Sequence, residues 1–295
     1  MIEKILILDF GSQYTQLIAR SVREANVYCE IIPYNKEIDF NKDLKGVILS
    51  GSPFSVNDTN ALLIDIKKIS DKVPVLAICY GAQLVAKVFG GLVEKSDKRE
   101  YGRSKLQIKI EDDLLKGVEN DSDVWMSHSD TIKNLPESFS ISACTHNIPV
   151  AAFSSKQTIN PIFGLQFHPE VYHSAEGKKI IKNFLVNICK CSQEWTPAHF
   201  ISDTVASLRE KIGNKKVIMA LSGGVDSTVA ATLIFKAIGE NLYGIFVDNG
   251  VLRKDEFEQV IESCKSIGLN ITGVDAKDYF YKKLAGKTDP EEKRK

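Results

Sequence analysis

Short apolar runs alternate with amphipathic segments along the first half of the chain. Four runs lack regular polar alternation, which is typical of strands buried on both faces of a parallel sheet. They are Ile2–Leu8, Val27–Ile32, Gly46–Leu49 and Val75–Ile78. Apolar residues at helical spacing predict helices over Gln13–Ala25, Asn60–Ser70 and Ala82–Val88, with Asp58 or Thr59 capping the second. Strands alternating with helices predict an α/β fold with a doubly wound, mostly parallel sheet.

From Gly91 to Phe167 the pattern changes to short strands separated by turns. The predicted strands are Lys105–Ile110, Asp123–Met126, Phe139–Cys144, Val150–Phe153 and Ile162–Phe167. The polar residues Ser127–Asp130 follow the second of these and are expected to form a turn. A helix over Ala175–Cys189 is expected to close this half.

The second half opens with another amphipathic helix, predicted over His199–Ile212. Buried strands are predicted at Lys216–Leu221, Tyr243–Val247 and Ile271–Val274, with a helix over Thr228–Ala237 between the first two. We therefore expect one α/β domain over residues 1–190, a linker over 191–200, and a second, partial α/β domain over 201–295.

Composition and charge narrow the class of protein. The 295 residues are 43% hydrophobic and 26% charged, and 38 basic residues balance 38 acidic ones, so net charge gives no reason to expect nucleic-acid or membrane binding. Asp9 interrupts the apolar start, so neither a signal peptide nor a membrane span is expected. Six scattered cysteines form no disulfide framework and favour the cytoplasm, and Cys189-Lys190-Cys191 lacks a second ligand cluster, so no metal site is expected.

Cys79 directly follows a buried strand and precedes a helix. This strand-turn-helix arrangement is typical of a nucleophile elbow, because the free N–H groups of the helix's first turn lower a thiol pKa and bind an oxyanion. The alternative is a core cysteine, since free cysteines usually pack as small hydrophobic residues.

A second segment, Gly164–Glu170, favours the catalytic interpretation. His168 and Glu170 lie at i and i+2, which places both side chains on one side of an extended segment. A carboxylate that orients an imidazole is what a cysteine nucleophile needs for proton transfer. A His-x-Glu motif alone is weak evidence for catalysis. The evidence is stronger together with Cys79 and with the Leu49–Pro53 turn at another strand end.

Taken together, CYGAQ, GLQFHPE and the SGSP turn resemble class I glutamine amidotransferases. The resemblance implies that Cys79 attacks the glutamine carboxamide, that His168 transfers protons, that Glu170 orients His168, and that a glutamyl thioester forms. It also implies an oxyanion hole and substrate contacts at Gly51, Ser52, Tyr80, Gln83, Ser127, His128, Ser129 and Asp130.

Positions 52 and 129 depart from the family, which usually has glycine at both. If position 52 requires a positive φ, serine there costs on the order of 1 kcal/mol, and the oxyanion hole would form only when a partner or nucleotide orders the loop.

In the second half, Ser222-Gly223-Gly224-Val225-Asp226-Ser227 lies between a buried strand and a helix. Glycines let a backbone close around an anion, and serine hydroxyls and helix N–H groups bind phosphate oxygens. The turn resembles the pyrophosphate-binding loop of N-type ATP pyrophosphatases and is not a Walker A loop. The resemblance implies that it holds ATP, with Mg²⁺ as part of the substrate and no prosthetic group.

The segments FVDNGVLR, ending at Arg253, and LAGKTDPEEKRK, ending at Lys295, resemble glutamine-hydrolysing GMP synthetases. This resemblance implies a cytoplasmic ligase that uses glutamine, ATP and xanthosine monophosphate (XMP), with an adenine contact near Val247. That family is dimeric, and we expect this chain to stop before its dimerisation domain, with an incomplete ligase half. Two alternatives stay open: an inactive or binding-only fragment, and the glutaminase of another ATP-pyrophosphatase amidotransferase.

Overall fold

The computed structural model describes residues 3–156 and 159–294. Contacts divide the chain into two compact units, Met1–Thr196 and Pro197–Lys295. Within the described residues, no helix combines the length and apolarity needed to cross a membrane.

The first unit is built on a nine-stranded sheet with the order β2-β1-β3-β4-β9-β8-β7-β5-β6. Five neighbouring strands run parallel: β1 (Lys4–Asp9), β2 (Tyr28–Pro33), β3 (Leu44–Leu49), β4 (Val75–Ile78) and β9 (Ile162–Leu165). The rest of the sheet is antiparallel and consists of β5 (Leu92–Ile108), β6 (Ser122–Asn134), β7 (Phe139–Cys144) and β8 (Ala152–Ser155). The predicted α/β fold class is confirmed.

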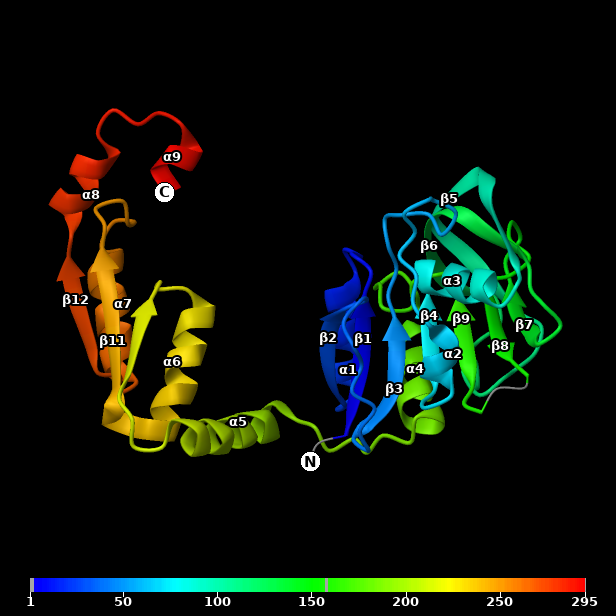
Figure 1. The fold of residues 1–295 in the computed structure, drawn as a ribbon, viewed down its shortest axis with the longest axis horizontal. Helices are drawn as coiled ribbons and strands as arrows, with labels where there is room; N and C mark the ends of the chain where they lie inside the picture. The colour runs from blue at the N-terminus through cyan, green and yellow to red at the C-terminus, as the bar shows by residue number, and fades with distance from the viewer. Residues whose placement is uncertain (1–2, 157–158, 295) are drawn as a thin grey trace. The chain divides into compact units, whose positions relative to one another are not determined.

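Helices cover both faces of the parallel part of this sheet (Figure 1). One face packs on α1 (Thr15–Glu24), α4 (Gly177–Lys182) and the π-helical turn η1 (Asn183–Ile188), and the other on α2 (Ile66–Ser70) and α3 (Tyr80–Val88). Along β1, Ile5 and Ile7 point to the first core while Leu6 and Leu8 point to the second. Both faces are buried over Ile5–Leu8, which is why these four residues are all apolar.

Register brings the carboxyl ends of four strands to one edge. Leu8 of β1 pairs with Leu49 of β3, Leu49 with Ala77 of β4, and Ile78 of β4 with Leu165 of β9. The residues that follow these strand ends therefore meet at the edge where open parallel sheets place their ligands.

Two local predictions in the first unit are wrong. The helix expected over Asn60–Ser70 covers only Ile66–Ser70, and its cap is Asp65, which accepts the Lys68 N–H at 3.0 Å. Asp58 instead accepts the Ser55 N–H at 3.1 Å and so stabilises a turn. Ser127–Asp130, predicted as a turn, lie inside β6, where pairing with β5 overrides their polar composition.

The second unit contains a parallel three-stranded sheet, β10 (Val217–Leu221), β11 (Leu242–Asp248) and β12 (Ile271–Asp275), in that order. Its helical elements are α5 (Pro197–Ile212), α6 (Val225–Ile238), η2 (Gly239–Asn241), α7 (Glu256–Ser266), α8 (Lys277–Leu284) and α9 (Pro290–Arg294). Helix α5 begins inside the segment predicted as a linker, and it buries no residue despite its predicted amphipathic character.

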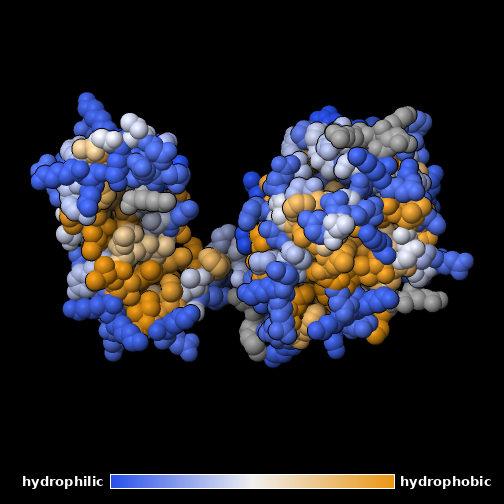
Figure 2. All heavy atoms as spheres, turned by 45° about the horizontal axis from the view of Figure 1, so that its top comes forward, coloured by the Kyte–Doolittle hydropathy of each residue, from blue (hydrophilic) through white to orange (hydrophobic). Residues whose placement is uncertain are grey.

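The core of the second unit is small and centres on Leu221, Leu242 and Phe246. Apolar side chains remain exposed on this unit, among them Ile218 at 74% and Val225 at 78%, and Figure 2 shows a broad apolar patch on its visible face.

Candidate active site

Cys79 forms a tight elbow between β4 and α3. Its backbone has φ 52° and ψ −105°, a conformation that a non-glycine residue adopts only under strain. The elbow also packs closely on β3, because a Cβ added to Gly81 would lie 2.7 Å from Leu49 Cβ and 2.9 Å from the Leu49 carbonyl oxygen. Only glycine fits there, so the helix starts close to the sheet and the thiol is held at the strand edge.

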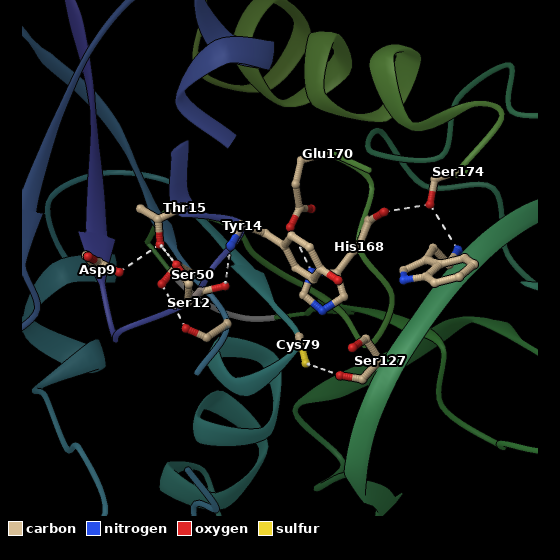
Figure 3. A network of polar contacts seen from close by, with 12 residues as sticks. Asp9, Ser12, Tyr14, Thr15, Ser50, Cys79, Ser127, His168, Glu170 and Ser174 are labelled. Carbon is tan, nitrogen blue, oxygen red and sulfur yellow. Dashed lines mark hydrogen bonds and ion pairs between the residues drawn. The ribbon is translucent and has the colours of Figure 1, made fainter. Parts of the chain in front are cut away.

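His168 and Glu170 form a buried pair beside this elbow (Figure 3). The Nδ1 atom of His168 lies 2.7 Å from Oε1 of Glu170, and the two side chains are 3% and 0% exposed. The backbone of His168 is tied to β6, because its N–H donates to the Trp125 carbonyl at 2.9 Å. Ser174 Oγ donates to the His168 carbonyl at 2.5 Å and accepts from the Trp125 N–H at 3.0 Å. The imidazole is thus held in place, and Nε2 is the ring nitrogen that remains available for proton transfer.

The imidazole has a shifted pKa. Burial lowers the pKa of His168, but the charges of Glu170 and Cys79, and hydrogen bonds to both, outweigh burial and hold this pKa well above 6.5. The arrangement therefore favours a protonated imidazole at His168, held between the side chains of Glu170 and Cys79.

The site opens into a cavity of about 390 Å³, which is lined by most of the site residues predicted in the first unit. Cys79 and His168 line it, together with Ser52, Tyr80, Gln83, Ser127, His128, Ser129 and Asp130. Gly51 lies against the catalytic pair, since a Cβ there would be 3.3 Å from His168 Cε1 and 3.6 Å from Cys79 Cβ. Glu170 is not among the residues that line the cavity. It contacts Nδ1 of His168, which is not the ring nitrogen proposed to exchange protons.

The β6 residues form one wall of the cavity. Gln83 Nε2 donates to the Asp130 carbonyl at 2.8 Å, and the Asp130 carboxylate accepts a short hydrogen bond from Ser55. The Ser127 carbonyl lies 3.8 Å from Cys79 Sγ. His128 is 4% exposed, and burial lowers its pKa to about 4, so its ring is neutral at pH 7.

The condition under which serine at position 52 would be strained, a positive φ, is not met. Among the described non-glycine residues, positive φ occurs at Asn26, Cys79, Asp121, Lys190 and Asp255, and Ser52 is not one of them. Within the described residues, neither the Ser52 N–H nor the Tyr80 N–H donates a hydrogen bond. Both amides are therefore available to a ligand.

Sequence reasoning assigned no part in the site to the turn between β1 and α1. Gly11, Ser12, Gln13 and Tyr14 line the same cavity, as do Pro53, Phe54 and Tyr101. Asp9 shapes this turn by accepting from the Gly11 N–H at 3.0 Å and from Thr15 Oγ1 at 2.7 Å. The available signal was a polar turn at the carboxyl end of a buried strand, the same signal that marked Ser50–Pro53.

The loop from Ser222 to Ser227 connects β10 to the start of α6, with Val225–Ser227 already inside the helix. Gly223 has φ 76°, and the hydroxyls of Ser222 and Ser227 lie 3.0 Å apart. A pocket of about 540 Å³ adjoins the loop, is lined by Gly223, Thr228, Arg253 and Lys254 among others, and does not include Val247. Within the described ranges, no group of three or more His, Cys, Asp or Glu residues could hold a metal ion.

Two family models match the chain, one in each unit. The family model for class-I glutamine amidotransferases matches residues 6–188, and the NAD synthase family model matches residues 198–294. The chain is 58% identical over its whole length to a glutamine-hydrolysing GMP synthase from Cytophaga hutchinsonii and 54% identical to one from Porphyromonas gingivalis. It spans 58% of the length of each of these relatives.

Solved structures resemble the first unit. A crystal structure from Thermoplasma acidophilum, described as one subunit of a GMP synthase, is 32% identical, with a TM-score of 0.55 over 64% of this chain and 95% of that one. A glutamine amidotransferase from Thermotoga maritima shares the fold at 17% identity, with a TM-score of 0.54 over 64% of this chain and 99% of that one. With more than half of its length matched by the family model, the chain belongs to the class-I glutamine amidotransferases.

Proposed function

We propose that the first unit hydrolyses glutamine to glutamate and ammonia through a covalent thioester on Cys79. The observation that carries this proposal is the strained Cys79 elbow beside the buried His168–Glu170 pair, with Nδ1 and Oε1 2.7 Å apart. A thiolate, a proton carrier and an orienting carboxylate are what amide cleavage requires.

In the first step the Cys79 thiolate attacks the carboxamide carbon and a C–S bond forms. The carbonyl oxygen becomes an oxyanion, for which we assign the free N–H groups of Ser52 and Tyr80 as donors. His168 Nε2 then gives its proton to the departing nitrogen, the C–N bond breaks, and ammonia leaves a thioester. In the second step His168 Nε2 takes a proton from water, and the resulting hydroxide attacks the thioester. The C–S bond then breaks to release glutamate.

We further propose that the ammonia serves GMP synthesis from XMP and ATP. The 58% and 54% identity to glutamine-hydrolysing GMP synthases supports this, although the chain spans 58% of their length. In this proposal the Ser222–Ser227 loop and the amino end of α6 hold the phosphates of Mg²⁺-bound ATP, and Val247 lies near the adenine. The same proposal includes the predicted domain bounds and a cytoplasmic location. It also includes dimerisation through a further domain.

Ammonia release from glutamine tests the first part. We expect release by the full chain, loss in Cys79→Ala, and retention in Cys144→Ala, which removes a half-buried thiol outside the cavity. Each is measured with and without ATP, Mg²⁺ and XMP. Equal release by the chain and by Cys79→Ala would overturn the assignment of the nucleophile.

The match of residues 198–294 to NAD synthase favours a second candidate, in which the ATP-using half activates an acceptor other than XMP. Pyrophosphate release from ATP in the presence of XMP, and not of nicotinate nucleotides, supports the GMP assignment. The reverse dependence supports the alternative.

A further inference from the structure

Ser50, the residue after β3, is fully buried and is held at four points. Its N–H donates to the Leu8 carbonyl at 3.1 Å, and its own carbonyl accepts from the Gly81 N–H at 3.2 Å. Its Oγ accepts from the Phe10 N–H at 3.0 Å and donates to the Gly51 carbonyl at 2.9 Å. One side chain thus links the ends of β1 and β3, and its backbone links them to the first turn of α3.

The hydroxyl fixes the orientation of the next peptide group. The Gly51 carbonyl and the Ser52 N–H belong to one planar trans peptide, in which C=O and N–H point in opposite directions. A hydrogen bond that holds the Gly51 carbonyl toward Ser50 therefore also sets the direction of the Ser52 N–H. That N–H donates to no other described residue and belongs to a residue that lines the cavity.

The second free amide is tied to the same residue. The Tyr80 N–H lies one residue before the Gly81 N–H, which donates to the Ser50 carbonyl. The tight fit of Gly81 against Leu49 leaves this part of α3 little room to move. Ser50 therefore fixes both peptide segments that carry the two proposed oxyanion donors.

We propose that Ser50 is a positioning residue for the oxyanion hole, and this inference rests on the proposed glutaminase function. Ser50 touches neither the cavity nor the reacting atoms, so it acts only through the Gly51–Ser52 peptide and the first turn of α3. Donors must lie within about 2.7–3.1 Å of the developing oxyanion, so a tilt of this peptide weakens transition-state binding more than substrate binding.

A purely structural role is the competing explanation, and a matched serine separates the two. Ser142 of β7 is equally buried and donates to the Asp112 carboxylate, outside the cavity. Ser50→Ala and Ser142→Ala should both destabilise the fold in urea unfolding. Only Ser50→Ala should lower kcat for ammonia release, by about 10- to 100-fold, with KM within twofold, because the donor is tilted rather than removed.

Alkylation of Cys79 by iodoacetamide supplies a readout that a collapsed site would change. This displacement at a saturated carbon forms a C–S bond, expels iodide and develops no oxyanion, so Ser50→Ala should react at the wild-type rate. Ser50→Thr, which keeps the hydroxyl, should restore kcat. Unchanged kcat in Ser50→Ala, or equal losses of kcat and alkylation rate, would overturn the inference.

Glutamate γ-semialdehyde separates this inference from the proposed function. The Cys79 thiolate adds to the aldehyde carbon, and the resulting hemithioacetal oxygen occupies the oxyanion hole without turnover. We expect the wild-type chain to bind the aldehyde and Ser50→Ala to bind about 10-fold more weakly, as the tilted donor implies. Equal affinities would overturn the role of Ser50 alone, whereas a wild-type chain that neither binds the aldehyde nor releases ammonia would overturn both proposals. If Ser50→Ala does not fold, Ser50→Cys, a weaker donor of similar shape, is measured in the same two assays with the same expected direction.

Discussion

The rings of Tyr14 and His168 meet edge to face, with centroids 4.9 Å apart and an interplanar angle of 68°. Tyr14 belongs to the turn between β1 and α1, where its N–H donates to Ser12 Oγ at 3.1 Å, and it lines the same cavity as Cys79 and His168. The phenol ring therefore restrains the imidazole through a contact separate from that of Glu170. We predict that Tyr14→Phe keeps kcat for ammonia release within about threefold, because the ring contact, worth about 1 kcal/mol, remains. Tyr14→Ala should lower kcat by about 10-fold, the larger loss reflecting a less restrained imidazole.

Tyr172→Ala is the control for this pair of variants. Tyr172 follows Glu170 by two residues, is 93% exposed, and does not line the cavity. Its removal should leave kcat unchanged. Equal kcat values for Tyr14→Ala and the wild-type chain would show that the ring contact has no catalytic effect.

The candidate site could be predicted where a chemically reactive residue directly follows the end of a buried strand. Cys79 follows β4, whose predicted bounds, Val75–Ile78, match the structure because a wholly apolar run has few other places to lie. His168 and Glu170 were found from their spacing, and the structure places them 2.7 Å apart. Tyr14 and Ser50 were not assigned roles, because their contacts to His168 and Gly51 depend on which strands are neighbours. That order is set by long-range packing and cannot be read from local pattern.

The wrong predictions have the same physical origin. Ser127–Asp130 are polar because they face a cavity, and a cavity wall in a strand has the composition of a turn. The helix over residues 60–70 was expected from helical spacing and a cap at Asp58 or Thr59, but Asp58 stabilises a turn and leaves Asp65 as the cap. The polarity of a residue reflects the surroundings of its side chain. The backbone conformation of such a segment is decided by its pairing with neighbouring strands.

His128 makes the stability of the first unit depend on pH. Its pKa is about 4 in the fold against 6.5 when unfolded, because burial disfavours the charged ring. As pH falls, the unfolded chain therefore binds the proton before the folded chain does. The stability that the neutral His128 contributes is fully present above pH 6.5 and is lost as pH falls toward 4. The difference between these two pKa values corresponds to roughly 3 kcal/mol. Urea unfolding between pH 7 and 4.5 should show this loss in the wild-type chain and a shallower loss in His128→Gln.

His146→Gln controls for the removal of a histidine, because His146 is exposed. Its stability should follow the wild-type pH dependence. Parallel stability curves for His128→Gln and the wild-type chain would mean that His128 does not carry the loss.

The positive φ of Cys79 predicts an unusual ranking of variants. Cys79→Ala keeps a Cβ at φ 52°, whereas Cys79→Gly removes it and relieves a strain of order 1–3 kcal/mol. Part of this gain is offset by the greater freedom of glycine in the unfolded chain. We expect Cys79→Gly to be about 1 kcal/mol more stable than Cys79→Ala in urea unfolding, with both inactive toward glutamine. A less stable glycine variant would show that the elbow is not strained.

The two glycines Gly223 and Gly213 offer a matched test of the proposed phosphate-binding loop in the second unit. Both have positive φ, 76° and 58°, so alanine at either should cost about 1 kcal/mol of backbone strain. Only Gly223 lies in the Ser222–Ser227 loop, where a Cβ would also come within 3.0 Å of Val260 Cγ2, while nothing lies within 4 Å of one at Gly213. In the proposed function the loop wraps phosphate oxygens with its backbone N–H groups, so Gly223→Ala should weaken Mg²⁺-ATP binding in calorimetry by about 10-fold. Gly213→Ala should bind like the wild-type chain, and equal weakening in both variants would mean that lost stability, not the loop, controls ATP affinity.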